Sequence, residues 1–173
     1  MKTRVIVTKS VITILLIAMM GCDKDGLKNH MAEALTSFEG KWEAGNATFS
    51  HSKSGLVTIS FDRYIDNIEI EVIFRNIELT EGTTNLLFYS VPILNEPTSI
   101  VHIILEGDQA GESYYVDTAS VLQSSITITS ITKHRVEGEF QVAYMIKGSP
   151  LDKVAPWIPD QFTLTEGRFN AKD

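Results

Sequence analysis

The sequence predicts an all-β domain, an antiparallel β-sandwich or flattened barrel of about nine short strands. Two observations support this prediction. From Phe38 onward, apolar and polar residues alternate with a period of two, and Gly, Asp and Asn residues typical of turns separate the alternating segments. Strands with this pattern bury one face and expose the other, as antiparallel sheets commonly do. A chain of 173 residues is long enough to bury a core in a single domain.

Residues 1–21 have the pattern of a secretory signal peptide. Three basic residues precede an apolar stretch at residues 11–20, which is too short for a bilayer because a span needs roughly 18 apolar residues. Gly21 and Cys22 follow as in a bacterial lipobox, although Met19 stands where Leu is usual. We therefore expect cleavage before Cys22 and acylation of its sulfur and of the new amino terminus. The alternative is an ordinary signal peptide that leaves this one cysteine as a free or disulfide-bonded thiol.

Residues 22–37 are predicted to be the lipidated Cys22 and a tether, because the charged run from Asp23 to Gly26 is short and ends in glycine. Residues 28–35 include good helix formers, so one short helix can precede the domain. A helix of one or two turns is marginal without packing. Residues 38–173 are then expected to form a single β domain.

The strands of this domain are predicted from apolar residues that share one face. They are, in chain order, Val57, Ile59 and Phe61; Ile68, Ile70, Val72 and Phe74; and Val136, Phe140, Val142, Tyr144 and Ile146. Residues 86–91 and 100–105 are apolar on both faces, which indicates central strands covered on both sides. Residues 124–131 are β-branched and favour another strand. Bulky aromatic residues crowd the inward positions, so we expect a filled core.

The last strand changes its inward face near Gly167. Phe162 and Leu164 share one parity, whereas Phe169 and Ala171 share the other. A β-bulge adds one residue to a strand and so shifts its alternation. We therefore predict a bulge in which Gly167 has a positive φ, so that both pairs of residues face the core.

The composition excludes some classes of partner. Removal of residues 1–21 takes away three of the 15 Lys and Arg residues and none of the 22 Asp and Glu residues, which leaves a net charge of −10. Such a domain lacks the basic stripe that replaces counterions on nucleic acid, and anionic lipid headgroups repel it. The expected partners are the membrane, reached through the lipid anchor on Cys22, and an unidentified protein or glycan.

No motif points to catalysis, a metal or a cofactor, and we predict none of the three. Four histidines lack metal-ligand spacing with one another or with a cysteine: His30, His51, His102 and His134. His102 lies in an apolar segment, where a hydrogen-bonded core histidine is the simpler interpretation. Glu69 and Glu71 share one face of a strand, whereas a glycosidase needs its carboxyls on two sides of a bond. Ser113 suggests a nucleophile, but the sequence indicates no base for it.

Residues 126–130, 136–140 and 162–172 follow the order strand, Gly-x-Phe strand, loop and Gly-Arg-Phe strand. This order resembles the C-terminal half of a family of small Bacteroidota lipoproteins with a β-rich domain of unknown function. The resemblance implies a β fold and no activity, since the shared motifs are structural. It also implies attachment to the outer membrane, and the acidic residues after Cys22 resemble a surface-export signal. The loop at residues 147–160 departs from the family as an insertion.

Two surface segments are candidates, one for binding and one for modification. Trp157 and Ile158 stand between Pro156 and Pro159, which hold an aromatic anchor in a rigid, extended loop suited to a partner. The alternative is that Trp157 folds back and plugs the open end of the domain. Thr118, between an aspartate and an alanine, resembles an O-glycosylation site of Bacteroidota proteins, and a plain turn explains it equally well.

The sequence thus favours an envelope lipoprotein of the outer membrane whose β domain is a non-enzymatic binding or structural module. Two alternatives stay open. One is a lipocalin-like barrel that holds a small apolar ligand, which a large interior cavity would support. The other is a hydrolase with a site assembled from separate loops, which a cleft joining His102 or His134 to a serine and an acid would support.

Overall fold

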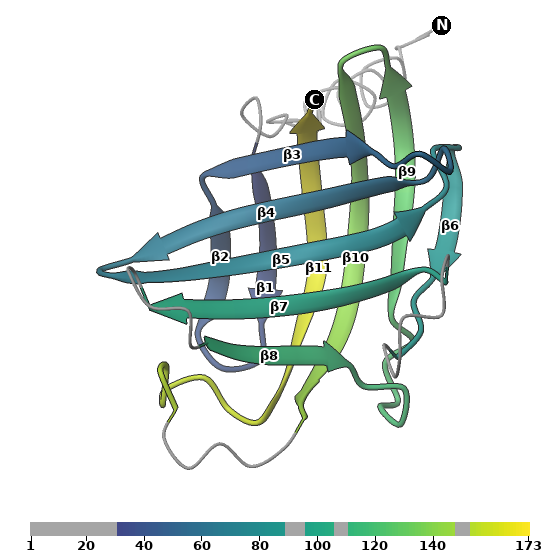
Figure 1. Ribbon diagram of the computed structural model, residues 1–173. Helices are drawn as coiled ribbons and strands as arrows, with labels where there is room; N and C mark the ends of the chain where they lie inside the picture. The colour runs from purple at the N-terminus through teal and green to yellow at the C-terminus, as the bar shows by residue number, and fades with distance from the viewer. Residues whose placement is uncertain (1–30, 89–95, 106–110, 148–152) are drawn as a thin grey trace, which may run out of the picture.

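The structure is a computed structural model that describes residues 31–88, 96–105, 111–147 and 153–173 (Figure 1). These residues form eleven strands and no helix, so the prediction of an all-β fold is confirmed, with more strands than the nine expected. The described residues therefore contain no helix long and apolar enough to cross a membrane. The strands are β1 (Ala32–Thr36), β2 (Gly40–Ala44), β3 (Asn46–His51), β4 (Val57–Ile65), β5 (Ile68–Ile77), β6 (Gly82–Asn85), β7 (Thr98–Leu105), β8 (Gly111–Val116), β9 (Ser125–Thr132), β10 (Arg135–Ile146) and β11 (Gln161–Lys172).

Strand pairing connects all eleven strands. Their order is β2-β1-β11-β3-β4-β5-β7-β8-β10-β9-β6, and β10 pairs additionally with β11, which closes a circuit of strands. Neighbours are antiparallel, except that β3 meets β11 in parallel at Thr48 and Lys172. In Figure 1, β3, β4, β5, β7 and β8 form one layer, which we call the front layer. It crosses a back layer of β2, β1, β11, β10, β9 and β6 at a steep angle.

Two long strands pass from one layer to the other. In β10, residues 135–141 pair with β9 of the back layer, whereas residues 144–146 pair with β8 of the front layer. In β11, residues 164–169 pair with β1, and Lys172 then meets β3. Because both strands have neighbours in both layers, the layers enclose one core between them.

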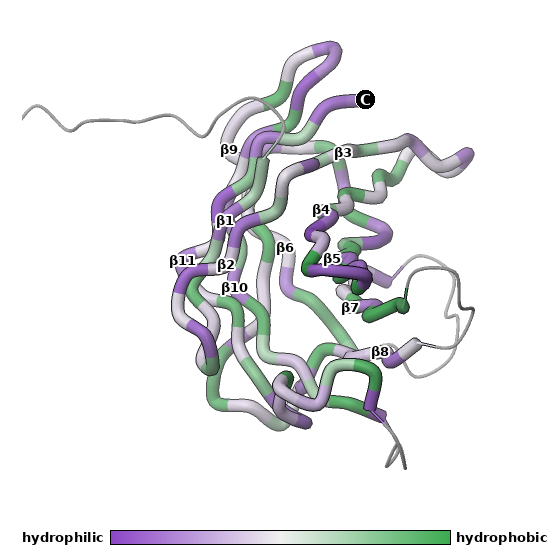
Figure 2. Tube along the Cα trace, turned by 90° about the vertical axis from the view of Figure 1, so that its left-hand side faces the viewer, coloured by the Kyte–Doolittle hydropathy of each residue, from purple (hydrophilic) through white to green (hydrophobic). Residues whose placement is uncertain are grey.

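The core is apolar and densely aromatic, and Figure 2 shows the two layers from the side with hydrophobic residues alternating along the strands. The predicted inward residues of β4, β5 and β10 are buried, apart from the partly buried Ile146. At the centre, the ring of Phe61 lies 5.6 Å from that of Phe74, 5.3 Å from that of Phe140 and 5.5 Å from that of Phe169. These rings come from both layers, so aromatic contacts hold the layers together.

One predicted element is wrong, and a second lies only partly in the described residues. The helix expected within residues 28–35 is a strand from Ala32 onward, because pairing with β2 and β11 overrides helix propensity. The sheet therefore begins before Phe38, inside the segment expected to be tether. Residues 89–91 of the strand expected at residues 86–91 lie outside the described residues, and within residues 86–88 Leu87 makes an isolated parallel bridge to Thr98.

The bulge in β11 is confirmed, but its geometry differs from the prediction. The registers of β11 with β10 and with β1 both shift near residue 166, and Phe162, Leu164, Phe169 and Ala171 are all buried as expected. The residue with positive φ is Glu166, at 52°, and not Gly167. Gly167 is required for a different reason, since its missing side chain makes room for an aromatic ring.

Candidate functional site

A row of polar side chains crosses the outer face of the front layer. The strand registers place them side by side, from β3 to β8, in the order Asn46, Asp62, Glu71, His102 and Ser113. Two hydrogen bonds join neighbours. Asn46 Nδ2 donates to Asp62 Oδ2 at 3.1 Å, and His102 Nδ1 lies 2.9 Å from Ser113 Oγ.

His102 and Ser113 have the geometry of a base beside a nucleophile. Burial, and then the positive charge of Arg75, lower the pKa of His102, so its ring is neutral at pH 7 and can accept the proton of a hydroxyl. His102 is therefore hydrogen-bonded as expected, but it lies half-buried on the outer face and not in the core. The sequence indicates no base for Ser113, but the structure places one beside it, His102 on the neighbouring strand β7.

The third member of a catalytic triad is not in place. Glu71 is beside His102 in the register, but within the described ranges it makes no hydrogen bond to the ring. Burial, with the negative charges of Asp62 and Glu69, raises the pKa of Glu71, which weakens its ability to stabilise a charged histidine. In the same part of the chain, no group of three or more His, Cys, Asp or Glu side chains is arranged to hold a metal ion.

Residues 153–160, which precede β11, close one end of the space between the layers. Ile158 is 2% exposed and packs in the core, whereas Trp157 is 48% exposed, so of the two residues predicted to bind a partner only Trp157 is accessible. Both residues line a crevice with Trp42, and its volume is about 20 Å³. A volume of this size holds about one water molecule. The crevice therefore has no room for an apolar ligand as it stands.

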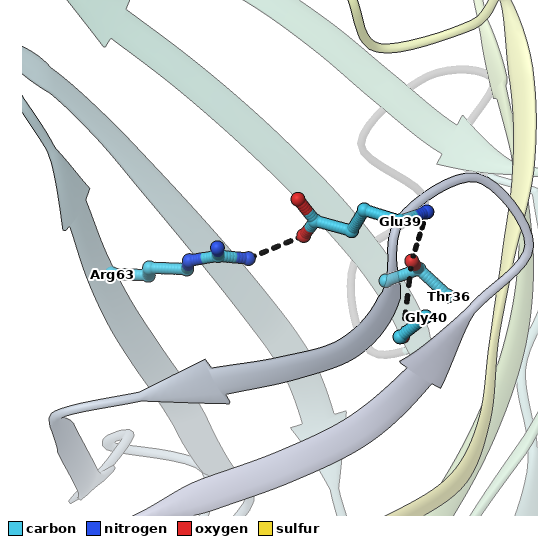
Figure 3. A network of polar contacts seen from close by, with 4 residues as sticks. All are labelled: Thr36, Glu39, Gly40 and Arg63. Atoms are coloured by element: carbon cyan, nitrogen blue, oxygen red, sulfur yellow. Dashed lines mark hydrogen bonds and ion pairs between the residues drawn. The ribbon is translucent and has the colours of Figure 1, made fainter.

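An ion pair joins β4 to the turn between β1 and β2, and Glu39 of this turn lines the crevice (Figure 3). Arg63 Nη1 on β4 donates to Glu39 Oε1 in the turn between β1 and β2. The turn is held in shape by Thr36, whose Oγ1 accepts from Glu39 N at 3.0 Å and donates to the Gly40 carbonyl at 3.2 Å. Since β2 is a terminal strand of the pairing order, this pair links the two layers where strand pairing does not.

The predicted modification site, Thr118, lies in the loop between β8 and β9. Its side chain is exposed, in a turn where Ala119 N donates to Asp117 Oδ1 at 2.9 Å and Ser120 N donates to the Asp117 carbonyl at 3.3 Å. This is an Asx turn, which Asp favours through its own side chain. The turn geometry and the exposure are both compatible with a modified hydroxyl.

One polar residue that the sequence analysis does not single out is Glu112. It is 6% exposed and points to the core side of β8 with Tyr114 and Val116. Tyr114 Oη donates to Glu112 Oε2 at 3.3 Å, while Oε1 has no hydrogen-bond partner among the described residues. The signal for its burial is the parity of β8, since Glu112 occupies the same face as two inward apolar residues.

The described residues thus define the class of the protein, an all-β domain whose two layers are joined by a closed circuit of strand pairs around a filled aromatic core. Comparisons with family models, with curated proteins and with solved structures find no match to this chain.

Proposed function

We propose that this protein is a lipoprotein of the bacterial cell envelope, acylated on Cys22, and that its β domain is a non-enzymatic binding or structural module. The run of apolar residues 11–20 that ends in Gly21 and Cys22 carries this proposal. These residues lie outside the part that the structure describes. Each buried methylene contributes about 0.8 kcal/mol, and stable attachment needs about two chains, so three acyl chains hold the domain at the membrane.

The location we propose is the outer membrane, with the domain displayed on the cell surface. The resemblance to Bacteroidota lipoproteins and the acidic residues after Cys22 support it. The strand β1 begins at the end of the molecule where β11 finishes, and residues 153–160 lie at the opposite end, where β11 starts (Figure 1). An anchor attached before β1 therefore leaves Trp157 on the side away from the membrane.

The fold supports binding on the outside of the domain. The closed circuit of strand pairs favours a flattened barrel over an open sandwich. The inward phenylalanines and the small crevice volume argue against the lipocalin-like alternative. We also propose Thr118 as an O-glycosylated residue, supported by its exposed turn.

Metabolic labelling with an alkyne-bearing fatty acid tests the anchor. The wild-type protein is expected to carry the label, and Cys22→Ser is expected to lose all of it, because serine has no sulfur to accept the diacylglyceryl group. Asp25→Asn serves as the control and should label like wild type. Equal labelling of wild type and Cys22→Ser would refute the lipoprotein proposal.

The hydrogen bond between His102 and Ser113 supports one second candidate, a hydrolase. We expect no reaction of Ser113 with a fluorophosphonate probe, because among the described residues Glu71 makes no hydrogen bond that would orient the His102 ring. Ser113→Ala and His102→Gln are the controls. Labelling of the wild type that rises with pH and disappears in both variants would establish a serine hydrolase instead.

A further inference from the structure

The outer face of the back layer contains a hollow with a volume of about 370 Å³ over β9, β10 and β11. This volume is within the roughly 300–1,000 Å³ of small-molecule sites. Its lining is polar: Ser125, Thr127, Glu139, Gln141, Glu166 and Arg168. The bulge in β11, where the registers with β10 and β1 both shift, lies at this hollow, and Glu166 and Gly167 of the bulge line it.

Three charged side chains of the hollow are left without partners. Glu139 on β10 stands directly opposite Arg168 on β11, yet neither of them, nor Glu166, makes an ion pair or side-chain hydrogen bond within the described part of the chain. Elsewhere on the same face, Lys41 pairs with both Glu33 and Glu43. The hollow therefore presents two carboxylate acceptors and one guanidinium donor that remain available.

The backbone of Glu166, one of these three charged residues, is strained. Glu166 has a φ of 52°, in the left-handed region that disfavours a side chain, although its neighbour Gly167 would adopt this conformation freely. Strain of this kind is often retained at binding sites. At position 166 the chain has a glutamate despite this strain, so a carboxylate lies at the wall of the hollow where a glycine would offer no side chain.

We propose that this hollow binds a neutral oligosaccharide, an inference that rests on the proposed binding function and names its ligand class. A sugar hydroxyl both donates and accepts hydrogen bonds, so it can serve the carboxylates, the guanidinium and the neutral side chains together. The two carboxylates repel nucleic acid and other polyanions, and the guanidinium of Arg168 repels polycations. An apolar ligand would leave the polar lining without hydrogen bonds.

A peptide strand is also excluded as the occupant. Thr127 pairs with β6 and β10, Glu139 with β9 and β11, and Arg168 with β10 and β1. The strands under the hollow therefore offer no free edge for β-augmentation. Phe140 borders the hollow but is only 4% exposed, so it gives a sugar ring no stacking surface, and we expect affinity in the millimolar range.

The test titrates the full-length protein in detergent with maltotriose, cellotriose and chitotriose. Saturation-transfer NMR detects the bound sugar and measures its affinity. At least one of these sugars is expected to bind, with an affinity that stays unchanged up to about 0.5 M NaCl because the ligand is neutral. Arg168→Ala and Glu139→Gln should each weaken binding at least tenfold. The matched controls, Arg75→Ala and Glu69→Gln on the front layer, should bind like wild type.

Glu166→Gly separates a binding role from a structural one. It should weaken sugar binding severalfold while its melting temperature stays at or above that of wild type, since the strained φ is relieved. The site proposal fails if no sugar binds, if the hollow variants bind like wild type, or if only oligolysine or an oligouronate binds. Such a failure leaves the lipoprotein proposal standing, because fatty-acid labelling of Cys22 tests that proposal separately. Cleavage of the sugar that is lost in Glu139→Gln would support the site and refute the non-enzymatic function.

Discussion

Gly167→Val is expected to lower the free energy of unfolding by about 3 kcal/mol, the upper end of the usual cost of overpacking a core. A Cβ at this position would lie 2.6 Å from Cε2 and Cζ of Phe140. The ring has little room to move, because it packs 5.3 Å from both Phe61 and Phe74. For a domain of this size the loss corresponds to roughly 10 °C in the melting temperature, measured by circular dichroism.

Gly45→Val is the matched control for this prediction. No atom lies within 4 Å of a Cβ built at Gly45, and its φ is not in the left-handed region, so valine should melt close to wild type. Gly138 forms the reciprocal case, since it pairs with Phe169 in the register and a Cβ there would lie 2.6 Å from that ring. If Gly167→Val melts like wild type, the ring of Phe140 does not lie over Gly167.

Phe61→Ala is expected to cost about 3–5 kcal/mol, the usual range for removing a fully buried phenylalanine. Phe61 on β4 is 0% exposed, and its ring contacts Phe74 of the front layer as well as Phe140 and Phe169 of the long strands β10 and β11. Its loss therefore removes contacts between the layers and leaves a cavity at the centre of the core. Urea unfolding monitored by tryptophan fluorescence measures the change.

The control is Tyr64→Ala on the same strand. Tyr64 is 68% exposed, and its hydroxyl donates to Glu69 at the surface, so the change should stay within about 0.5 kcal/mol. A loss below about 1 kcal/mol for Phe61→Ala would show that the two layers do not share this aromatic core.

The candidate sites depend on contacts between distant parts of the chain. Ser113 gains a neighbouring base only because β7 and β8 pair in the register that places His102 beside it. The hollow likewise combines side chains from β9, β10 and β11, with Glu139 and Arg168 brought opposite each other by strand pairing. Neither grouping has a local sequence motif.

The sequence alone was sufficient for the all-β class, the inward faces of β4, β5 and β10, and the shift of alternation in β11. These features follow from local stereochemistry, because side chains of a strand alternate between two faces and a bulge inverts that alternation. The lipobox at Cys22 is equally local, and it remains a sequence-based prediction.

Only the tertiary structure decided which strands pair and what each exposed side chain contacts. Ala32–Thr36 became a strand because β2 and β11 satisfy its backbone hydrogen bonds on both sides, an arrangement that helix propensity does not reveal. The bulge has its positive φ at Glu166, whereas the glycine is needed at position 167 because a Cβ there would collide with the ring of Phe140 on a neighbouring strand. Alternation specifies a face, but strand register specifies the neighbours, and register is a property of the whole sheet.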